Sequence, residues 1–186
     1  MSQINTEHTL AQVLKDHKLW LNSAGGSKTD LKADLRGADL SFADLTFADL
    51  TFADLHGANL RVADLSSANL RGANLNGADF RGANLRGANL TFADLRGADL
   101  TSANLRSANL NGADLRVADL PKGIYTFQGS KHQAIASYSM IRIGCENHKI
   151  EFWLENYKII GRMANYSKDE IKDYGDFIKW YSKKCK

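Results

Sequence analysis

The sequence contains few of the residues that mark several common classes of protein. Its 186 residues include a single proline and two cysteines, Cys145 and Cys185. Two cysteines are too few for a disulfide framework, so we expect a protein of a reducing compartment, the cytoplasm. No apolar run reaches the ~18 residues of a membrane span, and the N-terminus lacks the basic and apolar regions of a secretory signal. We therefore expect no membrane association.

Lysine is absent from the middle of the chain, and this absence reveals an uneven distribution of charge. Residues 33–120 contain eight arginines, 11 aspartates and no lysine, a net charge of −3. Residues 1–32 carry a net charge of +1 and residues 121–186 a net charge of +5. The overall charge of +3 is an average over unlike segments, so it says little about the charge of a partner.

The middle segment has neither the helical nor the strand period. Leucine recurs every five residues from Leu35 to Leu120, with Phe80 in one slot, which makes 18 centres. Alanine stands two positions before every centre, and Asp or Asn stands between them. Because helices need a period of about 3.6 and strands a period of 2, this pattern predicts a repeat architecture. Four sides of five residues would close a coil of 20, with leucine and alanine facing inward.

The motif Ala-(Asp/Asn)-Leu-X-X, as in residues 43–47, resembles that of the pentapeptide repeat proteins. The resemblance covers residues 33–120 and implies an all-β solenoid, a right-handed quadrilateral β-helix. It implies no catalytic residue and no cofactor, and the family includes DNA-mimicking inhibitors of type II topoisomerases. The centres that we expect to represent the core are Leu35, Leu55, Leu75, Phe80, Leu95 and Leu115.

The N-terminal segment is expected to cap the first coil, because the ends of a solenoid expose unpaired backbone and core. Residues 6–22 place apolar side chains at helical spacing, and Gly25-Gly26 predict the end of the helix. These features predict a capping helix within residues 1–28, ahead of a β-helix over residues 29–120. We expect His17, on the apolar face of this helix, to be a packed core residue.

Residues 121–186 are expected to form a small β-β-β-α-α module, because the repeat ends at Pro121. Ser167 and Glu170 form a capping box at the start of the last helix. The three strands are predicted over residues 124–128, 132–136 and 140–143. The two helices are predicted to begin near residue 149 and at residue 167. The module resembles the C-terminal extensions of some phage-encoded pentapeptide repeat proteins, which implies a phage-infected bacterial cell as the location.

The C-terminal segment offers one weak candidate metal site. Cys145 and His148 form a CxxH pair that His132 could extend to three ligands. Structural zinc sites use four ligands, so we expect no metal. No phosphate-binding loop or catalytic group of residues is present, so we expect no enzyme activity and no cofactor. The last helix mixes lysines with acidic residues, which disfavours direct binding of nucleic acid.

The first coil, residues 33–52, carries the most distinctive surface. Its net charge is −3, and its outward positions hold phenylalanine on three successive sides. Exposed aromatic residues in an acidic surround are typical of a protein interface; the alternative is that the N-terminal helix or a neighbouring subunit covers them. The candidate binding residues are Phe42, Phe47, Phe52, Phe92, Asp44 and Asp49.

Three functions remain open. The residues favour a non-enzymatic solenoid that binds a protein partner, and the C-terminal resemblance implies a phage-encoded inhibitor of a host or defence protein. The first alternative is a DNA mimic that inhibits gyrase or another DNA-binding enzyme. A mimic needs a continuous acidic flank, which arginines interrupt here: stacking by 20 residues places Arg61 beside Arg81 and Arg96 beside Arg116. The second alternative is a homo-oligomeric scaffold, assembled through the C-terminal module or the first coil.

Overall fold

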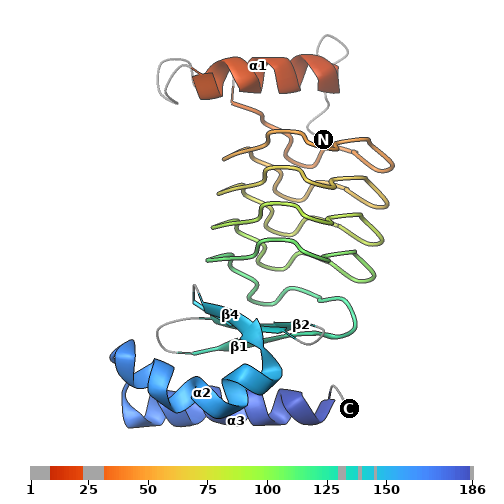
Figure 1. The fold of residues 1–186 in the computed structure, drawn as a ribbon. Coiled ribbons are helices and arrows are strands. Elements are labelled where there is room, and N and C mark those ends of the chain that lie inside the picture. The colour runs from red at the N-terminus through yellow and green to blue at the C-terminus, as the bar shows by residue number, and fades with distance from the viewer. Residues whose placement is uncertain (1–8, 23–31, 130–132, 138–139, 145, 185–186) are drawn as a thin grey trace. The chain divides into compact units, whose positions relative to one another are not determined.

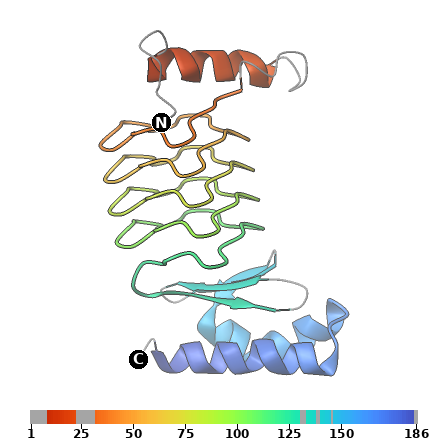
Figure 2. The same cartoon turned by 180° about the vertical axis from the view of Figure 1, so that it is seen from behind.

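The computed structural model describes residues 9–22, 32–129, 133–137, 140–144 and 146–184. The chain divides into two compact units, Met1–Lys122 and Gly123–Lys186 (Figure 1 and Figure 2). Each unit has a core of its own, so each is described by itself below.

The first unit begins with helix α1, Leu10–Asn22. Thr9 caps its N-terminus, since the Thr9 hydroxyl accepts a hydrogen bond from the backbone N–H of Gln12 at 3.3 Å. The buried residues of the helix are His17 and Trp20, which lie on one face because they are three positions apart. The predicted helix is confirmed over these residues, whereas the predicted stop at Gly25-Gly26 lies outside the described residues.

The repeat folds into stacked four-sided coils of 20 residues, as the period of five predicts (Figure 1). Fourteen parallel bridges join each Asp or Asn to the residue 20 positions further on, from Asp34–Asp54 to Asp99–Asp119. Backbone hydrogen bonds run between coils, for example from the N–H of Leu35 to the carbonyl of Asp54 at 2.7 Å. The corners close with turns in which the N–H of an alanine donates to the carbonyl of the Leu or Phe centre three residues before it.

Leucine and alanine fill the interior of the coils. A buried leucine contributes about 1.5–3 kcal/mol relative to an exposed one, so a column of centres stabilises the stack. The centres named above are at most 3% exposed: Leu35, Leu55, Leu75, Phe80, Leu95 and Leu115.

The corner geometry places one residue of each pentad in the left-handed region. The second X residue has φ near +60°, whether it is glycine, as at Gly57 (φ +65°), or not, as at Phe47 (φ +57°). Glycine adopts this conformation without strain, whereas a side chain there costs about 1–2 kcal/mol. Each non-glycine corner therefore keeps its side chain at an energetic cost.

The second unit is an antiparallel sheet followed by two helices. The strands occur in the order β1-β2-β3-β4, each paired with the next along the chain. Their bounds are Ile124–Gln128, Gln133–Ser137, Met140–Ile143 and Glu146–Lys149. The helices are α2, Ile150–Met163, and α3, Lys168–Lys184.

The predicted β-β-β-α-α order is wrong by one strand, because β4 was not expected. Its sequence is Glu-Asn-His-Lys, which is entirely polar and mostly exposed. A strand at the edge of a sheet needs no buried face, so it shows no alternation of apolar and polar residues. Backbone pairing with β3 defines this strand, in the register Ile141–His148.

The core of the second unit forms where the helices pack on the sheet. Trp153 of α2 donates its indole N–H to the carbonyl of Ile141 at 2.6 Å, which ties α2 to β3. The predicted capping box of α3 is confirmed. The N–H of Ser167 donates to Oε2 of Glu170 at 2.6 Å, and the N–H of Glu170 donates to Oγ of Ser167 at 3.2 Å.

Candidate functional site

Three phenylalanines of the first coil face solvent at its corners. Phe42, Phe47 and Phe52 are 75, 80 and 46% exposed, so α1 leaves them accessible. Their φ angles are +60°, +57° and +60°. A bulky residue in the left-handed region is an outlier, because its Cβ crowds the following carbonyl. These residues are therefore both conformationally strained and exposed to water.

Phe52, and Phe92 of a later coil, differ from Phe42 and Phe47 because each has a glycine beside its ring. The ring of Phe52 lies over Gly72 of the next coil, and the ring of Phe92 lies over Gly112. A Cβ on either glycine would overlap the ring in its present position, so a larger residue there would require the ring to move. This packing gives Phe52 a structural role that is independent of any partner.

Two aspartates of the first coil, Asp44 and Asp49, have hydroxyl partners, whereas Asp34 of the same coil pairs with Arg36 at 2.7 Å. Asp44 accepts hydrogen bonds from the Thr46 hydroxyl at 2.6 Å and the Thr46 N–H at 3.0 Å. The hydroxyl, and then the N–H, hold the pKa of Asp44 below its usual value. Asp49 is bonded in the same way by Thr51. In the part of the chain that the structure describes, neither carboxylate forms an ion pair.

Asp39 belongs with these two carboxylates, although it was missed as a candidate. It accepts hydrogen bonds from the Ser41 hydroxyl at 2.7 Å and the Ser41 N–H at 3.1 Å. The signal that identifies it is Asp-Leu-(Ser/Thr), in which a hydroxyl follows the aspartate two residues later. We call Phe42, Phe47, Phe52, Asp39, Asp44 and Asp49 the first-coil surface.

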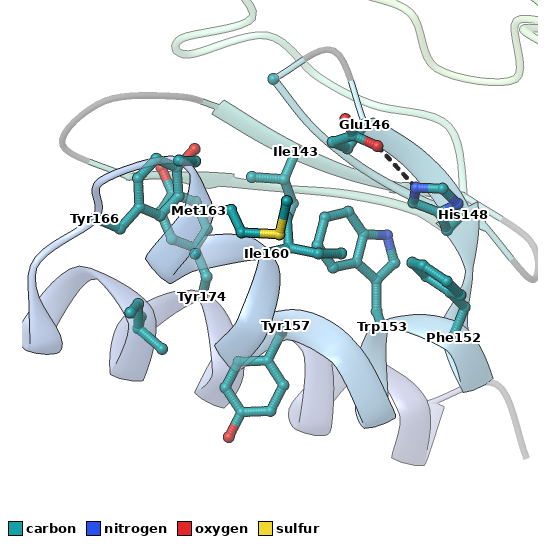
Figure 3. A pocket seen from close by; sticks show the side chains of 14 residues that line it. Ile143, Glu146, His148, Phe152, Trp153, Tyr157, Ile160, Met163, Tyr166 and Tyr174 are labelled. Atoms are coloured by element: carbon teal, nitrogen blue, oxygen red, sulfur yellow. Dashed lines mark hydrogen bonds and ion pairs between the residues drawn. The ribbon is translucent and has the colours of Figure 1, made fainter.

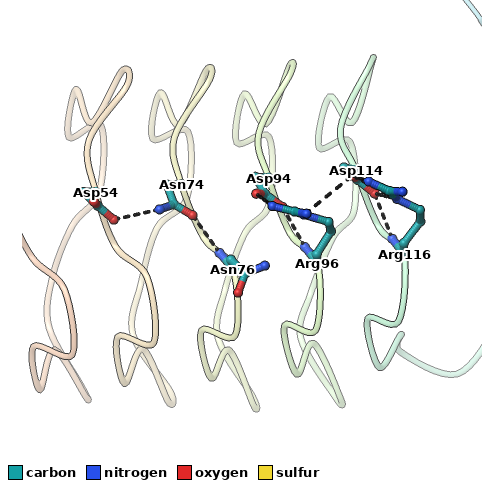
Figure 4. Close-up of polar contacts among 7 residues, drawn as sticks. All are labelled: Asp54, Asn74, Asn76, Asp94, Arg96, Asp114 and Arg116. Atoms are coloured by element: carbon teal, nitrogen blue, oxygen red, sulfur yellow. Dashed lines mark hydrogen bonds and ion pairs between the residues drawn. The ribbon is translucent and has the colours of Figure 1, made fainter.

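Further along the repeat, several aspartates pair with arginines, whereas Asp64 and Asp119 form no ion pair within the described residues. Arg96 pairs with Asp94 at 2.6 Å in its own pentad, and its Nε lies 3.7 Å from Asp114 of the next coil (Figure 4). Arg116 pairs with Asp114 at 2.6 Å. The carboxylates raise the pKa of both guanidinium groups above its usual value, first through the side-chain hydrogen bond. The predicted juxtaposition of Arg96 and Arg116 is thus offset by the aspartates between them.

Hydrogen bonds of Asn74 continue the column of side chains that contains Asp94 and Asp114. The Asn74 amide donates to Oδ1 of Asp54 at 2.9 Å, and the Asn74 oxygen accepts from the N–H of Asn76 at 3.3 Å (Figure 4). The Asp/Asn positions therefore serve the corners wherever they occur, and their negative charge is left uncompensated mainly on the first coil.

His17 joins α1 to the start of the repeat. It is fully buried, its Nδ1 accepts a hydrogen bond from the N–H of Ala33 at 3.1 Å, and its ring stacks on Trp20 with centroids 5.4 Å apart. Burial lowers the pKa of His17 below its ordinary value. The prediction of a packed histidine is confirmed, and the geometry requires the neutral ring because Nδ1 is an acceptor.

Of the weak metal candidates, only His148 lies within the described residues. His148 pairs with Glu146 at 2.8 Å, whereas Cys145 and His132 lie outside the described residues. Among the residues that the structure describes, no group of three His, Cys, Asp or Glu side chains could hold a metal ion. Within the same residues, no helix has the length and hydropathy needed to cross a membrane.

The repeat matches a known family. Residues 32–61, 63–101 and 98–122 match the family described as pentapeptide repeats, in eight copies. No curated protein matches the chain.

Several solved structures are similar to part of the chain. A pentapeptide repeat protein from the Arabidopsis thaliana thylakoid lumen is 37% identical, with 45% of this chain and 61% of that chain covered and a TM-score of 0.42. A pentapeptide repeat protein from Nostoc PCC 7120 is 42% identical. The match covers 61% of this chain and 86% of that chain, with a TM-score of 0.33. QnrB1, a plasmid-mediated fluoroquinolone resistance protein, is 20% identical. The match covers 45% of this chain and 53% of that chain, with a TM-score of 0.29.

The family assignment rests on the repeat itself, since the pentads run without interruption from residue 33 to residue 120. Eight matched copies of the family's repeat, stacked with a period of 20 residues, agree with that pattern. The chain therefore belongs to the pentapeptide repeat family, whose fold is a right-handed quadrilateral β-helix.

Proposed function

We propose that the protein is a non-enzymatic binding protein whose first-coil surface holds a protein partner. The observation that carries the proposal is the exposure of Phe42 and Phe47 in left-handed backbone. Each costs about 1–2 kcal/mol relative to an unstrained conformation, and neither ring has a glycine beside it as Phe52 does. Strained residues cluster at functional sites, and aromatic residues are enriched among binding hot spots, so the two features together support a binding role.

The charge of the surface indicates the chemistry of the partner. The carboxylates of Asp39, Asp44 and Asp49 lie on the same coil as the three rings. A partner that presents lysine or arginine around an apolar centre would complement both features. Because these charges are exposed, their attraction should speed association and should weaken as salt is added.

A finer proposal concerns the biological role. The resemblance of residues 121–186 to extensions of phage-encoded members supports an inhibitor of a host or defence protein. On this proposal the repeat presents the first-coil surface, and the partner is a bacterial protein.

Photo-crosslinking tests the proposed surface. Benzoylphenylalanine at position 47 should give a specific protein adduct in a bacterial lysate. The matched control is the same probe at Val117, a corner residue with φ +61° and 90% exposure. Adducts of the same identity and yield from both positions would rule out this choice of surface.

Inhibition of a DNA-binding enzyme by DNA mimicry is the second candidate. The family resemblance favours it, and the uncompensated aspartates of the first coil supply negative charge. The pairing of Asp94 and Asp114 with arginine weighs against a continuous acidic flank. A gyrase supercoiling assay separates the candidates, because a mimic inhibits at micromolar concentration or below and a partner-binding scaffold does not.

Self-association through the same surface is a third candidate. The net charges of −3 on residues 33–52 and +5 on residues 121–186 would attract one copy to another. Sedimentation velocity at low and high salt tests it. A monomer at both salt concentrations would exclude a charge-driven homo-oligomer.

A further inference from the structure

The second unit contains a cavity that no part of the proposed function uses. Its volume is about 450 Å³, and its lining comes from the ends of β3 and β4, one side of α2 and the start of α3 (Figure 3). Small-molecule sites typically occupy about 300–1,000 Å³ and are lined by apolar side chains with a few polar groups. The cavity therefore has the size of a ligand site.

Aromatic and aliphatic side chains form most of its wall. In Figure 3, Tyr166 and Tyr174 lie at one end, and Trp153 lies at the other, with Ile160 and Met163 between them. The two tyrosine rings stack with centroids 5.3 Å apart. An apolar molecule that lies against this wall would be removed from water where it contacts these side chains.

The polar groups gather at the Trp153 end. Oε2 of Glu146 lies 2.8 Å from Nε2 of His148, and the His148 ring lies against Phe152 with centroids 4.0 Å apart (Figure 3). The indole N–H of Trp153 is already donated to the carbonyl of Ile141. A ligand at this end thus meets a carboxylate and aromatic rings.

The sign of charge at this end selects the class of ligand. Glu146 is the one carboxylate among the lining residues that the structure describes, and none of them is a lysine or an arginine. A phosphate or carboxylate would meet Glu146 with no lysine or arginine among the described lining residues, and His148, the partner of Glu146, is positively charged only when protonated. An ammonium group would be attracted both by Glu146 and by the faces of the neighbouring rings.

We propose that this cavity binds an apolar aromatic molecule that carries a single amine. The aromatic part lies among Tyr166, Ile160 and Met163, and the protonated amine lies against Glu146. This inference is independent of the first-coil surface, which belongs to the other unit.

Three probes of one shape test the proposal on the full chain. They are 2-naphthylmethylamine, 2-naphthalenemethanol and 2-naphthoic acid, which differ only in the group at one end. Isothermal titration calorimetry should show the amine binding about tenfold more tightly than the acid, with the alcohol between them. Glu146→Gln should reduce the preference for the amine to within about twofold while the alcohol still binds.

A rim variant and a matched control locate the binding. Met163 lines the cavity and is 80% exposed, so Met163→Trp should fill the opening without disturbing the core. Ile159→Trp, on the same helix and 55% exposed but outside the lining, should leave affinity unchanged. In the unaltered protein, NMR spectra should show the amine shifting the methyl signals of Ile143 and Ile160.

Equal affinity for all three probes would overturn the proposal. So would the absence of binding by any of them, or methyl shifts confined to other residues. Because the spectra are recorded on the unaltered protein, the test does not depend on the folding of Met163→Trp.

Discussion

At the scale of single residues, non-glycine residues in left-handed backbone at the corners of the repeat reduce the stability of the fold. Glycine suits the left-handed corner, yet Phe42 and Phe47 occupy it with their rings in water. The two aspartates beside them have hydroxyl partners, whereas Asp94 and Asp114 have guanidinium partners. The first coil therefore differs from the others at its corners and its charges, although its leucine centres are likewise at most 3% exposed.

Replacement of an exposed corner phenylalanine should stabilise the fold. Phe47→Gly removes left-handed strain and little buried area, so the free energy of unfolding should rise by up to about 1 kcal/mol. Phe52→Gly should raise the free energy of unfolding by less, because it also removes the packing of the ring on Gly72. Urea denaturation of both variants measures the difference. A clear loss of stability in Phe47→Gly would mean that the ring has a structural role.

The buried histidine should make the first unit sensitive to acid. The pKa of His17 is lowered in the folded protein, so the unfolded chain binds a proton more readily. Its contribution is fully present above the ordinary pKa of about 6.5 and is lost as the pH falls from there toward the folded value. The slope is at most about 1.4 kcal/mol per pH unit for one proton.

Urea denaturation between pH 7.5 and pH 5 measures this effect. His17→Gln should flatten the pH profile over that range. An unaltered profile in His17→Gln would contradict the assignment of the slope to this residue.

At the scale of helices and strands, close contacts set the arrangement of the second unit. Gly175 of α3 faces the ring of Tyr157 on α2, and Gly161 of α2 faces Ile171 of α3. Each glycine therefore lets one helix approach the other. The helices hold Trp153 over β3, and with it one end of the cavity.

Gly175→Ala should destabilise the second unit even though alanine favours helices. Its Cβ would overlap the Tyr157 ring, which is itself buried, so a loss of about 1–3 kcal/mol is expected. Lys183→Ala, at an exposed position of the same helix, should change stability by less than about 0.5 kcal/mol. Calorimetric unfolding distinguishes the two variants. Equal melting temperatures would show that the helices can separate without loss.

The sequence predicts these elements unequally, for physical reasons. The corners and core of the repeat follow from leucine every five residues, and α3 follows from its capping box at Ser167. Strand β4 has no apolar alternation, so only its pairing with β3 reveals it. The cavity is lined by residues from four elements, so its position depends on packing that no local pattern encodes.

At the scale of the whole molecule, two units of opposite character share one chain. The first contains a regular stack, residues 33–120, whose basic residues are all arginines, and the second is a sheet with two helices and a surplus of lysine. Burial in the stack is highest in its middle: the leucine, phenylalanine and alanine side chains of residues 53–100 that face inward are at most 1% exposed. Leu105 and Leu110 are 7% exposed.

Hydrogen exchange should follow this gradient of burial. In a repeat protein each coil is stabilised by its neighbours, so central coils open less often than terminal ones. Amides of residues 53–100 should exchange more slowly than those of residues 105–120 in mass-spectrometric measurements. Uniform exchange along the repeat would indicate that the stack opens as a single unit.

The central claim is that the protein binds a partner through the first-coil surface. Quantitative affinity capture from a bacterial lysate tests it most directly, with the unaltered chain, Phe42→Gly/Phe47→Gly and the corner control Val117→Gly compared side by side. We predict at least one protein that the unaltered chain and the control retain equally and that the double variant retains at less than about a tenth of that amount. Identical sets of proteins in equal amounts from all three would contradict the account.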